Sequence, residues 1–165
     1  MRILGIDPGY GITGFGLIEG DRGQFRLLRC GAITTTPNSE FTGRLMTIYQ
    51  DMKDLLDLAK PDAVAIEELF FGQNVTTGIN VAQARGVILL AIRQAEVPIY
   101  EYKPMQVKQS VVGYGKASKH QVMDMTKRLL HLEAVPKPDD AADAVAIALC
   151  HARSSTSLLG RLQHP

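Results

Sequence analysis

The chain has 165 residues, 18 basic and 17 acidic side chains and a net charge of +1, and 45% of its residues are hydrophobic. This size and composition fit one globular domain with its own core and exclude an intrinsically disordered chain. A net charge near zero argues at first against a nucleic-acid partner, because nucleic-acid binders usually carry a basic excess.

The sequence also argues against a membrane or secreted protein. The apolar runs of the sequence, such as residues 87–92, are far shorter than the roughly 20 residues of a membrane-spanning helix. Asp7 interrupts the N-terminal apolar stretch too early for a signal peptide. Cys30 and Cys150 lie in apolar segments, as buried thiols in a reducing compartment do. We therefore expect a cytoplasmic protein with no membrane partner.

The hydrophobic pattern predicts a single domain over residues 1–153 and a short tail, 154–165, that carries no motif. Three β-rich runs with short turns predict an antiparallel meander, at residues 2–7, 12–18 and 25–35. The later predicted elements are a helix at 41–59, a strand at 63–66, a helix at 79–95, a strand at 98–102 and helices at 104–112, 118–132 and 139–153. This order predicts an α/β domain built on one mixed sheet.

Two of these helices allow more detailed predictions. Ser39 is the expected N-cap of the helix at 41–59, and Pro61 its stop. Residues 79–95 are apolar on more than one face, which is typical of a helix buried on two sides. One side can pack on the sheet. The other side belongs either to the same core or to a second subunit, and the residues leave both alternatives open.

Residues 9–14 match the dinucleotide-binding pattern G-x-G-x-x-G. That motif requires a helix to open at its glycines, so that the pyrophosphate meets a helix N-terminus. Gly14 and Gly16 lie in the segment that follows, and each would destabilise a helix by about 1 kcal/mol. Residues 25–39 contain no acid that would bind a ribose. We therefore expect a tight hairpin, in which glycines let the backbone bend or approach another segment.

Acidic residues lie at the ends of three predicted elements. Asp7 closes one apolar strand, and Glu67 and Glu68 close another. Asp140 and Asp143 share one face of the last helix, and the alanines between them let that helix approach a sheet closely. If the two strands are neighbours, four carboxylates converge, and such a cluster needs a counter-charge.

A carboxylate cluster of this kind suits Mg²⁺, which prefers hard oxygen ligands. Two such ions about 3.5–4 Å apart can promote phosphodiester cleavage. Each acid also has an ordinary structural explanation. Asp139 and Asp140 can be an N-cap and a first-turn acid, Asp7 a turn residue, and the two glutamates a solvated strand end. Spacing alone leaves both interpretations open.

Five segments occur together in this chain: ILGIDPG at 3–9, AIEE at 65–68, AQARG at 82–86, QVKQSVVG at 106–113 and DAADA at 140–144. With these segments, in this order and spacing, the chain resembles the RuvC Holliday-junction resolvases of the ribonuclease-H-like superfamily. The resemblance implies a ribonuclease-H-like fold, a five-stranded mixed sheet flanked by helices. It also implies a homodimer formed through the helix that includes residues 82–86.

The resemblance further implies a metal site. Asp7, Glu67, Asp140 and Asp143 are expected to hold two Mg²⁺ ions per subunit, with Mn²⁺ as a substitute. This assignment chooses Glu67 over Glu68 and leaves Asp139 as a cap.

Basic and aromatic residues are expected to contact DNA. By resemblance, Phe70 stacks at the unpaired centre of a junction, and Lys108 and Lys119 lie near the cleaved strand. Lys116 belongs to the same basic segment, residues 102–132, which contains six lysines and arginines and one acid. The near-neutral total charge therefore conceals a basic segment suited to phosphates.

The expected protein is a structure-selective endonuclease of recombination and repair. It resolves four-way Holliday junctions by symmetric paired nicks and, by resemblance, meets the RuvA–RuvB branch-migration complex. Two alternatives remain. One is a nucleotide-binding module of the actin and sugar-kinase type, which also places an acid and glycines after its first strand. The other is a non-catalytic junction-binding protein of the same fold, which would lack one of the acids.

Overall fold

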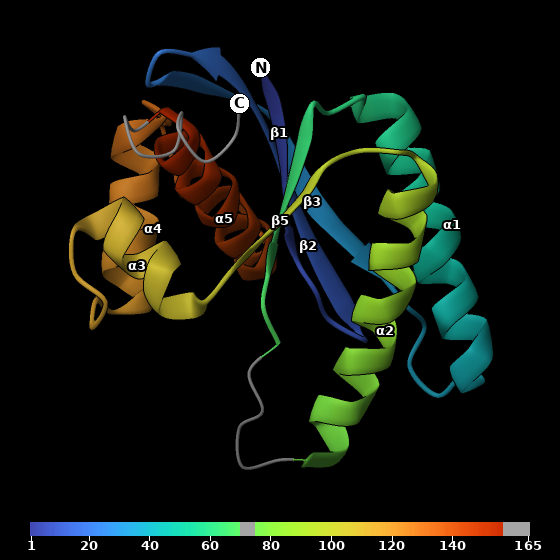
Figure 1. Cartoon of the computed structure of the whole chain (residues 1–165). Coiled ribbons are helices and arrows are strands. Elements are labelled where there is room, and N and C mark those ends of the chain that lie inside the picture. The colour runs from blue at the N-terminus through green and yellow to red at the C-terminus, as the bar shows by residue number, and fades with distance from the viewer. Residues whose placement is uncertain (70–74, 157–165) are drawn as a thin grey trace.

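The computed structural model describes residues 1–69 and 75–156 of the chain. Its elements are β1 (Arg2–Asp7), β2 (Ile12–Asp21), β3 (Gln24–Thr34), α1 (Phe41–Ala59), β4 (Ala63–Glu67), α2 (Val75–Gln94), β5 (Ile99–Tyr102), α3 (Pro104–Val112), α4 (Lys119–Leu129) and α5 (Asp139–Thr156). Figure 1 shows α1 and α2 on one face of the sheet and α3, α4 and α5 on the other. The predicted α/β fold with a five-stranded mixed sheet is confirmed. No helix within the described residues is both long and apolar enough to cross a bilayer.

The sheet has the strand order β3-β2-β1-β4-β5. Its first three strands form the predicted antiparallel meander, whereas β1, β4 and β5 run parallel to one another. Side chains alternate along a strand, so Leu4 and Ile6 of β1 enter the core with α1 and α2, while Ile3 enters the core with α5. Gly5 and Asp7 follow the alternation of Ile3 and face α5.

The glycine-rich segment at residues 9–14 forms the predicted hairpin. β2 begins at Ile12, so no helix opens at these glycines. The hydroxyl of the fully buried Thr13 donates a 2.8 Å hydrogen bond to the Gly9 carbonyl. A Cβ at Gly9 would lie 1.9 Å from the Ile12 carbonyl oxygen, so this turn has no room for a side chain.

Helix α5 lies directly on β1 and β2 where glycines of the strands meet the helix backbone. A Cβ added at Gly5 would lie 2.0 Å from the Ala144 carbonyl oxygen, and one at Gly14 would lie 2.0 Å from the Asp140 carbonyl oxygen. Backbone therefore packs on backbone, as predicted from the alanines of this helix. The consequence is a fixed distance between the acids of α5 and the end of β1.

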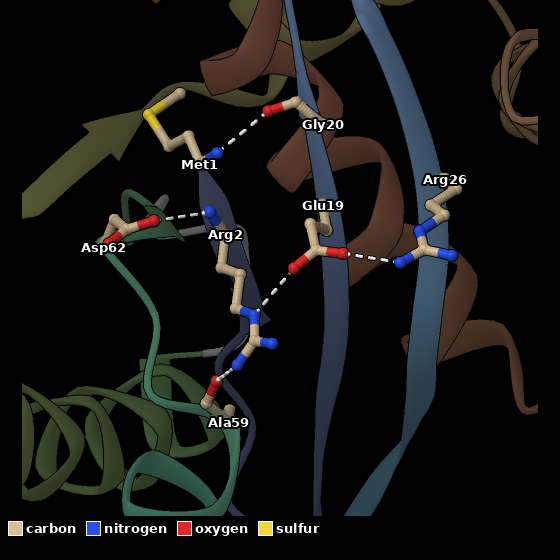
Figure 2. Close-up of polar contacts among 7 residues, drawn as sticks. All are labelled: Met1, Arg2, Glu19, Gly20, Arg26, Ala59 and Asp62. Atoms are coloured by element: carbon tan, nitrogen blue, oxygen red, sulfur yellow. Dashed lines mark hydrogen bonds and ion pairs between the residues drawn. The ribbon is translucent and has the colours of Figure 1, made fainter.

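Polar contacts hold the start of β1 between its neighbours (Figure 2). The Arg2 backbone N–H donates to the Asp62 carboxylate at 2.6 Å, and the Arg2 guanidinium pairs with Glu19 of β2 at 2.9 Å. Arg26 of β3 pairs with the same glutamate at 2.7 Å. Hydrogen bonds from Arg26 and then Arg2 lower the pKa of Glu19 to about 2. These contacts tie β1 to β2, β3 and the segment entering β4, at the end of the strand opposite Asp7.

The predicted cap of α1 is wrong. The N-cap position is Glu40, and no side chain caps the helix there. The Ser39 hydroxyl instead donates a 2.7 Å hydrogen bond to the Thr36 carbonyl, because a serine in a turn finds a local backbone partner as readily as a helix end. The predicted stop is close, since Lys60 turns into the left-handed conformation directly before Pro61.

Other helix boundaries differ by a few residues. Helix α2 begins at Val75 rather than residue 79, and α4 ends at Leu129 rather than residue 132. Helix α5 continues to Thr156, three residues past the predicted end at residue 153. Frayed or polar helix ends lack the apolar periodicity on which the predictions were based.

Candidate active site

Asp7 and Glu67 lie side by side because β1 and β4 are parallel neighbours. Ile6 is the partner of Ile66 in the strand register, and each strand ends one residue later. Ile6 and Ile66 both point into the core with α1 and α2. By alternation, the two acids point to the opposite face, toward α5.

Helix α5 adds a third acid. Asp143 lines a pocket of about 280 Å³ together with Asp7 and Glu67. Lys108 of α3 and Lys119 of α4 line the same pocket. Its other walls are mainly apolar, formed by Pro104, Val107, Val122, Ala146 and Ile147. The end of the sheet and three helices thus gather three predicted metal ligands and two predicted DNA-binding lysines.

Burial and the charges of neighbouring carboxylates raise the pKa values of Asp7 and Glu67. Burial raises the pKa of Asp7 from 3.8 to about 7, with further contributions from Glu67, Asp143 and Asp140, against the lowering effect of Lys119. Burial, followed by the charge of Asp143, also raises the pKa of Glu67. The cluster is therefore short of positive charge.

Lys119 supplies part of that positive charge. Its Nζ lies 2.8 Å from Asp143 Oδ2 and 3.8 Å from Asp139 Oδ2. The hydrogen bond with Asp143 is the main cause that raises the pKa of Lys119. Its side chain remains 53% exposed. A lysine predicted to contact DNA thus also pairs with a predicted metal ligand.

Asp140 and Asp143 are placed differently, although they are three residues apart on one helix. Asp143 lines the pocket, whereas Asp140 is not among the lining residues. The backbone of Asp140 packs against Gly14 of β2. Its charge is nevertheless close enough to raise the pKa of Asp7.

Asp139 is not the cap of α5. It is the first residue of the helix, and the Pro138 carbonyl accepts the N–H of Ala142 at 3.2 Å. Asp139 pairs with Lys137 at 3.4 Å and with Lys119. The expected assignment is wrong by one residue, because Pro138 occupies the preceding position.

Other predicted residues lie beside the pocket or outside the described region. Lys116 is exposed between α3 and α4 and does not line the pocket. Glu68 lines a second pocket of about 510 Å³, and Lys108 lines both pockets. Phe70 lies outside the described residues.

The donor chemistry of the pocket fits a hard divalent cation. Across residues 1–69 and 75–156, no three Asp, Glu, His or Cys side chains are arranged closely enough to hold a metal ion without rearrangement. Three carboxylates nevertheless line one pocket, and their repulsion contributes to the raised pKa of Asp7. Hard oxygen donors with unbalanced negative charge are what Mg²⁺ binds.

Arg85 is a residue of this site for which the sequence predicts no individual role. Arg85 of α2 donates a 3.1 Å hydrogen bond from Nε to the Glu67 carbonyl. The two residues lie on different elements, so no local pattern predicts their contact. The AQARG segment at 82–86 was the available signal, but it identified a motif and not a contact.

Comparisons with known proteins agree on one family. The family model for "Crossover junction endodeoxyribonuclease RuvC" matches residues 3–151. A crossover junction endodeoxyribonuclease RuvC from Brevibacillus brevis is 53% identical over 153 residues, covering 93% of this chain and 92% of the relative. One from Ruminiclostridium cellulolyticum is 49% identical over 154 residues, covering 93% of each chain.

A solved structure agrees with these relatives. Thermus thermophilus RuvC in complex with a Holliday junction substrate is similar to this chain with a TM-score of 0.89 and 38% identity, over 94% of this chain and 95% of that one. These similarities do not favour a nucleotide-binding module. The chain belongs to the RuvC family of crossover junction endodeoxyribonucleases.

Proposed function

We propose that this protein resolves four-way Holliday junctions by paired, symmetric nicks that depend on divalent metal ions. The observation that carries the proposal is the pocket in which Asp7, Glu67 and Asp143 meet. Family membership supports the junction as substrate, since the similar Thermus structure holds a Holliday junction. The presence of all four predicted acids argues against a non-catalytic junction-binding protein.

Asp7, Glu67, Asp140 and Asp143 would hold two Mg²⁺ ions, or Mn²⁺ in their place. Such ions supply Lewis-acid activation of water and stabilisation of the leaving oxygen. The carboxylates of the chain set where the ions bind, and the close packing of α5 on β1 keeps the acids of both elements at a fixed separation. Catalysis then depends on positioning and electrostatics.

Lysines on the same side of the pocket would hold the DNA backbone. Lys108 and Lys119 line the pocket, so a phosphate in contact with them lies next to the carboxylates. Lys116 extends this positive surface between α3 and α4. Phe70, which immediately follows Leu69, would stack on a base at the unpaired centre of the junction.

Two active sites are needed for two nicks, and α2 offers the surface for dimerisation. Its residues Ile79 and Leu90 are 49% and 54% exposed although both are apolar. They lie on one face, since the 11 residues from Ile79 to Leu90 make just over three helical turns. The opposite side of α2 packs in the core through Ala84, Ile88, Ala91 and Ile92. We propose that a second copy covers the exposed face of α2.

The remaining assignments belong to the same proposal. Residues 1–153 form the catalytic domain, and residues 154–165 include the last helical residues and a short tail. The protein works in the cytoplasm, beside the RuvA–RuvB complex that moves junctions.

The decisive experiment compares cleavage of a synthetic four-way junction with cleavage of a linear duplex made from the same arms. We expect paired nicks at symmetric positions of the junction, only with Mg²⁺ or Mn²⁺, and an intact duplex. Equal cleavage of the duplex would indicate a general nuclease instead. A marked increase in melting temperature with ATP would favour the nucleotide-binding alternative.

A further inference from the structure

Arg85 connects helix α2 to the ends of two strands of the sheet. Its Nε donates to the Glu67 carbonyl at 3.1 Å, and its Nη2 pairs with the carboxylate of Glu101 in β5. The Arg85 side chain is only 13% exposed. A nearly buried guanidinium with two partners is held in one orientation, because its donors form a rigid planar fork.

The Glu67 carbonyl needs this donor because of the residue that follows β1. The N–H groups of Val64 and Glu68 point to β5, where they donate to Pro98 and Tyr102. The intervening odd-numbered residues of β4 therefore direct their backbone groups to β1.

In the observed register, which pairs Ile6 with Ile66, the Glu67 carbonyl faces the residue after Asp7. That residue is Pro8, which has no N–H to donate. A partly buried carbonyl without a donor costs stability, and Arg85 provides a donor from outside the strand ladder.

We propose that Arg85 is a positioning residue for the Glu67 carboxylate. By completing the hydrogen bonding at the last residue of β4, it fixes the backbone from which that side chain enters the pocket. Glu101 in turn fixes the guanidinium. This inference rests on the proposed function, in which Glu67 is a metal ligand.

The test measures metal binding without DNA and without turnover. Mn²⁺ is titrated calorimetrically into metal-free wild type, Arg85→Gln, Arg85→Lys and Glu101→Gln. We expect Arg85→Gln to weaken Mn²⁺ binding by about tenfold, the size of effect typical when a group that orients a ligand is removed. Arg85→Lys should be intermediate, because one ammonium cannot reproduce the fork. Glu101→Gln should have the smallest effect, because its amide oxygen still accepts from Arg85.

A matched control separates positioning from general stability. Arg26→Gln also removes an arginine–glutamate pair, at the other end of the sheet, and should leave Mn²⁺ affinity unchanged. Junction affinity in EDTA should stay within about twofold of wild type for Arg85→Gln, while the Mg²⁺ concentration that gives half-maximal cleavage rises with the Mn²⁺ dissociation constant.

Wild-type Mn²⁺ affinity in Arg85→Gln would overturn the inference, whatever its melting temperature. If that variant does not fold, Arg85→Lys and Glu101→Gln decide in the same way, since wild-type metal affinity in both would overturn it. Glu67→Gln distinguishes this failure from that of the proposed function. If Glu67→Gln binds Mn²⁺ as wild type does, Glu67 is not a ligand and the proposed site itself is wrong.

Discussion

The ammonium of Lys119 lies 2.8 Å from the carboxylate of Asp143, at a pocket that also contains Asp7 and Glu67. One lysine thus offsets part of the charge of a cluster in which neighbouring carboxylates help to raise the pKa values of Asp7 and Glu67. The same ammonium is exposed enough to meet a DNA phosphate. This position of Lys119 relates the electrostatics of the free protein to the DNA contact that we propose for it.

Asp7→Asn should abolish cleavage and leave junction binding intact. The carboxamide keeps the size of the side chain but loses the charge proposed to bind the metal, and the lysines proposed to contact phosphates are untouched. Gel-shift titration in EDTA and a cleavage assay in Mg²⁺ measure the two properties separately. Cleavage at the wild-type rate would rule out Asp7 as a ligand.

The stability of the metal-free protein should fall as the pH rises from about 4 to about 7. The pKa of Asp7 is 3.8 when unperturbed and about 7 in the fold, so the native state holds a proton that the unfolded chain releases. Between these values the native state binds more protons, and the free energy of unfolding decreases with pH. The full rise in the pKa of Asp7 corresponds to a loss of at most about 4 kcal/mol in the free energy of unfolding.

Asp7→Asn should therefore melt at a higher temperature than wild type at pH 7.5 in EDTA. Saturating Mg²⁺ should stabilise wild type and have much less effect on the variant. Scanning calorimetry at pH 5 and pH 7.5 checks both statements. If the two proteins respond to pH alike, the perturbed group is not Asp7.

Lys119→Ala should weaken junction binding and reduce the slope of log K against log salt by about 1, as the loss of one phosphate contact does. Lys53→Ala on α1, which lies on the other face of the sheet, serves as the control. Binding measured by anisotropy at several salt concentrations gives both slopes. An unchanged slope for Lys119→Ala would mean that Lys119 contacts no phosphate and serves only to pair with Asp143.

Gly14→Ala should destabilise the protein by several kcal/mol or prevent folding, because its Cβ would lie 2.0 Å from the Asp140 carbonyl oxygen. Gly43→Ala, on helix α1, meets nothing within 4 Å and should stabilise the protein by about 0.5–1 kcal/mol. Urea denaturation of both variants measures the difference. Equal stabilities of the Gly14→Ala and Gly43→Ala variants would mean that the packing of α5 does not require a glycine at residue 14.

The sequence predicted elements whose signal is local. The apolar run that marks β1 and the periodicity of α1 both follow from burial of their side chains, and both elements formed where expected. The hairpin at residues 9–14 followed from glycines that disfavour a helix.

Other features depend on contacts that a sequence pattern does not contain. The spacing of Asp140 and Asp143 places them on one helix face, but the rotation of α5 against the sheet decides which of them lines the pocket. The pairing of Lys119 with Asp143 joins two helices. The bond from Arg85 to the Glu67 carbonyl relates to Pro8, which follows the neighbouring strand β1.

The bare backbone contact between α5 and the sheet has a consequence for how variants of this protein are interpreted. Gly5 and Gly14 hold no proton, metal or phosphate, yet a methyl group at either would push the helix that carries Asp143 away from the strand that carries Asp7. A screen for lost activity would therefore report these glycines together with the acids. Assays of folding distinguish these glycines, which are needed for the packing of α5, from the acids, which are needed for the chemistry.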